Sequence, residues 1–174
     1  NKVTNISLDR NYSILHRCSD YSGQKSRRVE VLDGFWFCGP RESFRDVKFD
    51  SLSFTGFHFY DIDISLQIGS SRENYVIFDI DVEHFSNGKL TIGWIEDSIK
   101  LIEKWKKRLP VHSNHFSKRE LLRHEVAVFF NFCVICSRTK ASNFFIRKTI
   151  SHYFKLRWFL IINKFTASIL LWCL

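Results

Sequence analysis

Residues 54–67 read FTGFHFYDIDISLQ, in which a glycine opens an aromatic run that ends at two carboxylates, Asp61 and Asp63. Apolar residues spaced by four within residues 60–68 predict a short helix. Successive helical residues differ by about 100°, so the two carboxylates would point about 200° apart. They would not share a face. We therefore expect one carboxylate to look into a cleft while the other caps a helix or pairs elsewhere.

A second signal follows at residues 75–84, which read YVIFDIDVEH. Apolar and acidic residues alternate, which predicts one strand that ends at His84. Asn87 and Gly88 then predict a turn. The strand would have an apolar face of Phe78, Ile80, Val82 and His84 and a solvated face of Asp79, Asp81 and Glu83.

The chain before the central stretch predicts further β-structure. Residues 29–38 read VEVLDGFWFC, and their β-branched and aromatic residues predict a strand that is interrupted at Asp33-Gly34. A glycine inside a strand pattern indicates a bulge or a close backbone approach. Residues 1–28 are polar, and we expect loops there with short strands.

Helical patterns dominate the C-terminal part. Apolar residues spaced by three or four predict a helix over residues 95–109, which Pro110 stops. Ser117 and Glu120 have the spacing of a capping box, and an apolar helix is expected from there to about residue 135. Residues 141–174 continue as helix-like, aromatic and basic sequence.

Two features of this part have structural interpretations. The pair Cys133 and Cys136 lies inside an apolar helical pattern without the second pair that a zinc site needs, so we expect no function for it. Residues 158–174 are mostly apolar but marginal in length for a membrane span, and Lys164 would lie near the middle of that span.

Charge is distributed unevenly along the chain. Residues 1–110 carry 16 basic and 16 acidic residues, whereas residues 111–174 carry 10 basic and 2 acidic ones, which accounts for the net charge of +8. This asymmetry predicts an anionic partner for residues 111–174, either a membrane surface or a polyanion. No nucleic-acid-binding motif is legible, so nucleic acid is not the expected partner. The odd number of cysteines favours a reducing compartment.

The order of these signals resembles the second half of bacterial family-2-like glycosyltransferases with a GT-A fold. The resemblance covers about residues 29–110 and implies an α/β class, as part of a Rossmann-like mixed sheet with helices. Residues 1–110 would then be the C-terminal part of the glycosyltransferase domain, and residues 111–174 a basic, aromatic helical tail. The matching stretches are VLDG (31–34), FD (49–50), GFHFYDID (56–63), HFSNG (84–88), KW (104–105) and LP (109–110).

The resemblance also implies roles for single residues. Asp61 matches the residue expected to act as general base, and Tyr60 stands where most relatives carry a glutamate. His84 matches a position that completes the site of a divalent cation, Mn²⁺ or Mg²⁺. Structural roles stay open for all of them, as a cap, an ion pair or a buried histidine. The implied substrate-binding residues are Asp33, Gly34, His58, Tyr60 and Asp63.

Such enzymes move a sugar from a nucleotide-sugar to a saccharide or lipid-linked acceptor, as in polysaccharide biosynthesis. A carboxylate can take the proton of the attacking hydroxyl, and a divalent cation can offset the charge of the leaving diphosphate. We expect the protein in the cytoplasm. The helices of residues 111–174 would either pack on the domain or attach it peripherally to the inner membrane.

One departure from the family pattern concerns the nucleotide-binding half. Relatives carry an earlier Asp-x-Asp motif, whereas Asp61-Ile62-Asp63 and Asp79-Ile80-Asp81 come too late in the pattern to serve as that motif. The chain also begins at Asn1 and contains no methionine, so we expect a fragment that lacks this half. Two alternatives stay open: a non-catalytic module that binds a membrane surface or polyanion, and an inactive transferase remnant.

Overall fold

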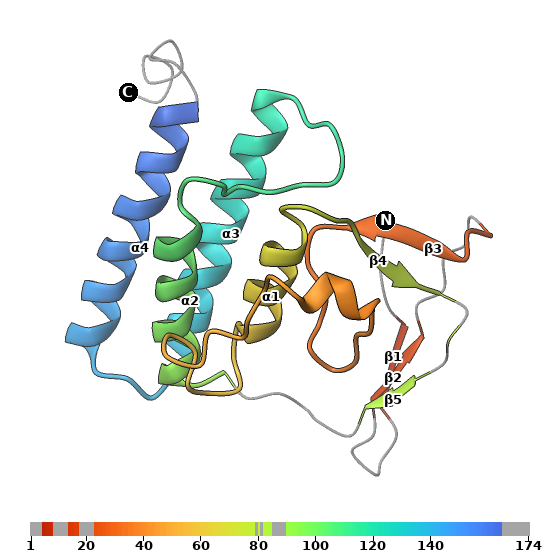
Figure 1. The fold of residues 1–174 in the computed structure, drawn as a ribbon. Helices are drawn as coiled ribbons and strands as arrows, with labels where there is room; N and C mark the ends of the chain where they lie inside the picture. Colours follow the sequence, from red (N-terminus) through yellow and green to blue (C-terminus); the bar gives the residue numbers. More distant parts are fainter. Residues whose placement is uncertain are drawn as a thin grey trace. The chain divides into compact units, whose positions relative to one another are not determined.

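Figure 1 shows the computed structural model, which describes residues 5–8, 14–17, 23–78, 80, 82–84 and 90–164. For residues 5–8, 14–17, 82–84 and 158–164 only the backbone is described. The expected α/β class is confirmed at this coarse level. In chain order the elements are β1 (Asn5–Leu8), β2 (Ile14–Arg17), β3 (Ser26–Val29), a 3₁₀ helix (Arg41–Phe44), α1 (Tyr60–Ile68), β4 (Asn74–Ile77), β5 (Val82–His84), α2 (Ile92–Trp105), α3 (Lys118–Arg138) and α4 (Asn143–Lys164).

The chain divides into two compact units. Unit 1 combines Asn1–Leu52 with Tyr60–Lys89, and unit 2 combines Ser53–Phe59 with Leu90–Leu174. Helix α2 thus belongs to the same unit as α3 and α4. The expected functional division at residue 110 stays a prediction.

The strands of unit 1 form two small antiparallel sheets (Figure 1). In one sheet β3 pairs with β4, with Ser26 opposite Ile77 and Val29 opposite Asn74. In the other, β2 lies between β1 and β5. Helix α1 provides the buried part of this unit, because its residues 63–66 and Ile68 are all buried.

The expected single strand over residues 75–84 is wrong. β4 ends at Ile77, where the next backbone N–H, of Phe78, donates to the carbonyl of Lys25. β5 begins at Val82 and pairs with β2 in the other sheet. Alternation along one segment cannot distinguish a long strand from two short ones with different partners. The expected solvated face and the turn at residues 87–88 lie outside the described residues.

The expected strand over residues 29–38 is also wrong, since β3 ends at Val29. Side chains bind the backbone of the following segment instead of a neighbouring strand. The Asp33 carboxylate accepts a hydrogen bond from Phe35 N–H at 3.0 Å, and Gly34 N–H donates to Asp61 at 2.8 Å. Such local acceptors compete with a sheet ladder.

The helices of unit 2 begin at clear caps. Thr91 accepts a hydrogen bond from Trp94 N–H and starts α2 three residues earlier than expected, and α2 ends at Trp105, before Pro110. Ser117 and Glu120 form the expected capping box at the start of α3. The buried core of this unit is formed by Ile95, Ile102, Phe132, Cys136 and Tyr153.

Residues 53–59 lie against α2 within unit 2. Lys100 donates to the carbonyl of Ser53 at 3.1 Å, and the ring of Phe59 lies 5.1 Å from that of Trp94. Within the described residues, no helix combines the length and the apolar character that crossing a membrane requires.

Candidate functional site

The Asp33-Gly34 turn is bound to the first turn of helix α1. Gly34 N–H donates to Asp61 Oδ2 at 2.8 Å, and the Tyr60 hydroxyl donates to the carbonyl of Gly34 at 3.3 Å. The backbone N–H and the carbonyl of Gly34 are therefore both bound by consecutive residues of α1. The contact brings together residues 27 positions apart in the chain.

Position 34 needs a glycine because the two segments approach closely. A Cβ atom there would lie 2.5 Å from Tyr60 Oη and 2.9 Å from Asp61 Cβ, both too short for real contacts. The close backbone approach expected at this glycine is therefore confirmed, although no strand surrounds it.

Asp61 is held in one orientation. Its Oδ1 accepts a hydrogen bond from Ile62 N–H at 2.8 Å, while Oδ2 accepts from Gly34. Its carbonyl accepts from the Ser65 hydroxyl at 2.7 Å, and Ser65 Oγ in turn accepts from Leu32 N–H at 3.1 Å. A carboxylate in the first turn also interacts favourably with the helix dipole.

Tyr60 completes this group as a protonated hydroxyl. Partial burial, and then the negative charges of Asp61 and Asp33, raise the pKa of Tyr60 above its usual value. The phenol therefore stays a hydrogen-bond donor through neutral pH. Its ring also packs near Phe49, with centroids 6.2 Å apart.

A pocket of about 200 Å³ adjoins the turn. One wall comes from residues 32, 33 and 35–38, and the other from β4 and Ile80. Asp33 supplies its carboxylate, and Trp36, 54% exposed, is its largest aromatic residue. An apolar pocket with few polar groups is typical of a small-molecule site. The lining residues are Leu32, Asp33, Phe35, Trp36, Phe37, Cys38, Tyr75, Val76, Ile77 and Ile80.

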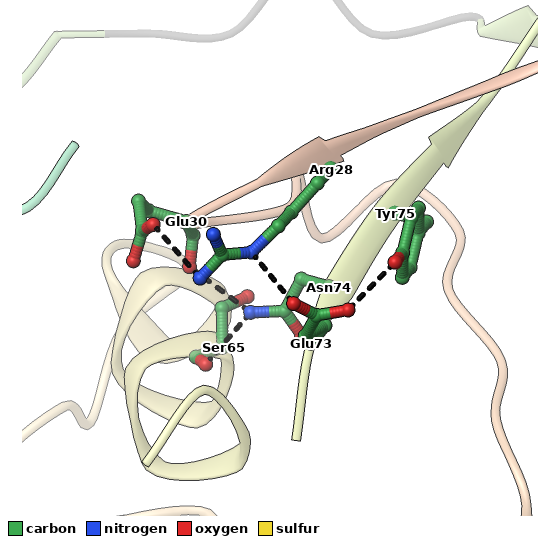
Figure 2. A network of polar contacts seen from close by, with 6 residues as sticks. All are labelled: Arg28, Glu30, Ser65, Glu73, Asn74 and Tyr75. Atoms are coloured by element: carbon green, nitrogen blue, oxygen red, sulfur yellow. Dashed lines mark hydrogen bonds and ion pairs between the residues drawn. The ribbon is translucent and has the colours of Figure 1, made fainter. Parts of the chain in front are cut away.

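A polar network supports the β4 wall (Figure 2). The Tyr75 hydroxyl donates to Glu73 at 2.6 Å, and Glu73 also pairs with Arg28 of β3 at 3.2 Å. Arg28 further contacts Glu30 at 3.8 Å. The hydrogen bond to Glu73 raises the pKa of Tyr75. This network fixes the position of the Tyr75 ring at the pocket.

Asn74 links the same wall to helix α1. Its buried amide donates to the carbonyls of Glu30 and Ser65, both at 3.0 Å (Figure 2). Ser65 also holds Leu32, a residue of the opposite wall, through its hydroxyl. Both walls of the pocket are thus bound to α1 by hydrogen bonds.

The structure brings together four of the sequence-predicted site residues: Asp33, Gly34, Tyr60 and Asp61. Asp63 lies apart from them, fully buried, where it accepts a hydrogen bond from Gln67 at 2.8 Å. The two carboxylates of α1 therefore have different environments, as their spacing predicts. The proposed binding role of Asp63 stays a prediction.

Two further predicted residues are described apart from this group. His58 belongs to unit 2, and its binding role stays a prediction. His84 lies in β5 opposite Ile14, and its side chain lies outside the described residues. Among the side chains that are described, no three His, Cys, Asp or Glu residues come close enough to hold a metal ion.

The sequence analysis missed the aromatic wall of the pocket. Residues 35–37 read FWF, and a strand there would alternate their side chains between two faces. Three consecutive aromatic residues beside a turn are a signal for an exposed, ring-lined surface.

Comparisons of the chain with protein-family models, with curated proteins and with solved structures found no match. A functional assignment must therefore come from the chemistry of the pocket and of the Asp33-Gly34 turn.

Proposed function

We propose that this chain is part of a glycosyltransferase with a GT-A fold, which moves a sugar from a nucleotide-sugar donor to a saccharide or lipid-linked acceptor. The observation that carries the proposal is the contact of Gly34 with Tyr60 and Asp61, next to Asp33 in the lining of an aromatic pocket. These are residues that the resemblance to the family selects from two distant stretches.

The pocket has the chemistry of a sugar site. Aromatic faces such as that of Trp36 suit the C–H face of a sugar ring, and the Asp33 carboxylate can accept hydrogen bonds from its hydroxyl groups. A volume of about 200 Å³ suits one monosaccharide ring rather than a longer saccharide. We assign this pocket to a sugar ring of the donor or the acceptor.

Asp61 has the features of a general base. Its two N–H contacts fix the carboxylate, yet each oxygen keeps a further lone pair for an acceptor hydroxyl. In the proposed step, the acceptor oxygen bonds to the anomeric carbon and its proton passes to Asp61. The bond from that carbon to the diphosphate oxygen breaks, and the nucleoside diphosphate leaves with the electron pair. A divalent cation, Mn²⁺ or Mg²⁺, would offset the negative charge of the leaving diphosphate.

The test is diphosphate release by the purified chain with UDP-glucose, UDP-N-acetylglucosamine or GDP-mannose, with either cation and with water as acceptor. Asp61→Asn should lower the rate about 100-fold or more, which is the usual contribution of a general base. Asp46→Asn, an exposed carboxylate of the same unit, is the charge-matched control and should keep the wild-type rate.

The choice of asparagine separates chemistry from folding. Its single side-chain oxygen can still accept one of the two N–H groups that the carboxylate binds, from Gly34 or Ile62. Asp61→Ala leaves both without this acceptor and should cost about 1–3 kcal/mol of stability. Release at more than half the wild-type rate in a folded Asp61→Asn protein would remove Asp61 as the base. No release by the wild-type chain with any donor would contradict catalysis by this chain alone.

A further inference from the structure

Helix α3 exposes an apolar stripe. Val126, Phe130 and Val134 follow one another at intervals of four, so they share a face. Their side chains are 44%, 63% and 44% exposed. Arg119 and Arg123 continue the same face toward the start of the helix and are exposed as well. The stripe is therefore apolar along its length and cationic at one end.

Aromatic rings join this stripe to helix α4. The ring of Phe129 lies 6.1 Å from that of Phe130 and 5.5 Å from that of Phe154 on α4. Phe154 is 46% exposed. Arg147 lies seven residues before Phe154, on the same side of α4, and is exposed. Lys155, also exposed, is the next residue after Phe154 and lies about 100° farther around the helix, at the edge of this side. We name Val126, Phe130, Val134, Arg147, Phe154 and Lys155 the α3–α4 face.

Few carboxylates are available near these basic residues to neutralise their charge. Residues 111–174 contain two acidic residues, Glu120 and Glu125. Glu120 binds Ser117 in the cap of α3, and Glu125 is buried and paired with Arg157. Helix α4 itself has no acidic residue, and Glu103 of α2 pairs with His152 at 2.7 Å.

We propose that the α3–α4 face binds the surface of an anionic lipid bilayer. Exposed rings and aliphatic side chains would enter the boundary between headgroups and acyl chains, and Arg147 and Lys155 would contact lipid phosphates. The valines favour lipid over nucleic acid, because they gain from burial in the acyl region but offer no ring for base stacking. This surface is independent of the proposed sugar site.

The test is co-sedimentation of the full chain with vesicles of phosphatidylcholine alone or with 30% phosphatidylserine. Anionic vesicles should bind at least tenfold more tightly, and the affinity should fall with added salt. Two double variants of exposed residues, Val126→Ser/Phe130→Ser and Arg147→Glu/Lys155→Glu, should each weaken this binding at least tenfold. Their circular dichroism and melting should match the wild type.

A charge-matched control isolates the face from net charge. Lys106→Glu/Lys107→Glu makes the same charge change at exposed positions after α2, and should alter binding less than threefold. An equal loss in this control would overturn the proposal. So would equal binding to both vesicles, or tighter binding to single-stranded RNA that Val126→Ser/Phe130→Ser leaves unchanged. Self-association of the wild type, abolished by that variant while vesicles bind normally, would assign the stripe to a second copy instead.

Discussion

The carboxylate of Asp61 accepts a hydrogen bond from the backbone N–H of Gly34 at 2.8 Å, across 27 positions of the chain. This bond places the first turn of α1 one residue from Asp33, which lines the pocket. A residue that anchors the fold is therefore also the residue proposed as base. Because the two roles use different lone pairs of the same carboxylate, substitutions can separate them.

Gly34→Ala should destabilise unit 1. The added Cβ would meet Asp61 Cβ at 2.9 Å, and because this atom is attached to the helix backbone the turn must move away from α1. Overpacking of this kind costs about 1–3 kcal/mol, which urea unfolding measures. Gly39→Ala is the matched control, since its Cβ would approach no atom more closely than 3.4 Å, at the Phe44 ring. Equal stability of the two variants would mean that the turn does not require glycine at position 34.

The starts of α1 and α3 followed from the sequence because their signals are local, whereas the Thr91 cap of α2 was missed. The spacing of apolar residues defined α1, and Ser117 with Glu120 defined the start of α3. The bounds of the strands could not be predicted in the same way, because a strand forms only where another strand pairs with it. Nothing in residues 75–84 indicates that Asn74–Ile77 pairs with β3 while Val82–His84 pairs with β2.

The candidate site was predictable only in part. The resemblance implied one site formed by Asp33, Gly34, His58, Tyr60, Asp61, Asp63 and His84. In the structure Gly34 binds Tyr60 and Asp61, and Asp33 adjoins this contact, whereas the roles of these residues stay predictions. The spacing of these residues along the chain could not predict the contact of Gly34 with Tyr60 and Asp61, because that contact depends on how the turn folds onto α1. Trp36 was missed because its segment was interpreted as a strand.

Asn74→Asp should be more destabilising near pH 7 than near pH 4. The Asn74 amide donates to the carbonyls of Glu30 and Ser65, and an ionised carboxylate there would face both oxygens without a proton. An unsatisfied buried group costs about 1–3 kcal/mol, and more when charged. Protonation restores one donor, so the stability gap to wild type should narrow as the pH falls. Urea unfolding at both pH values measures this gap.

Asn74→Ala serves as the control for this prediction, because alanine removes the amide without adding a titrating group. Its stability gap to wild type should be the same at both pH values. A gap for Asn74→Asp that is equally independent of pH would contradict the proposed contact with the two carbonyls.

Tyr153 should make stability fall above pH 10. Burial raises the pKa of Tyr153 from 10.0 to about 12, against the lowering effect of Arg157. The folded state then holds the Tyr153 proton more tightly than the unfolded state does. The contribution of this group to the free energy of unfolding is therefore complete below pH 10 and is lost as the pH rises toward 12. At pH 11 the loss is about 1.4 kcal/mol relative to pH 8.

The test compares urea unfolding of wild type and Tyr153→Phe at pH 8 and pH 11. Between pH 8 and pH 11, the free energy of unfolding of Tyr153→Phe should fall by about 1.4 kcal/mol less than that of the wild type. Some loss should remain in both proteins, because burial also raises the pKa of the Cys136 thiol from 9.0 to about 11. The same loss in both proteins would show that Tyr153 titrates normally.

Cys38 should report on occupancy of the pocket. It is exposed and lines the pocket, whereas Cys136 is fully buried with a raised pKa. Iodoacetamide, followed by peptide mass spectrometry, should therefore label Cys38 much faster than Cys136 at pH 8. A sugar ring bound in the pocket would cover the Cys38 thiol. Saturating UDP-glucose should therefore slow the labelling of Cys38 several-fold. UDP alone is the control for nucleotide binding elsewhere, and should slow it less. Unchanged labelling of Cys38 with every nucleotide-sugar and free monosaccharide tested would exclude this pocket as the sugar site.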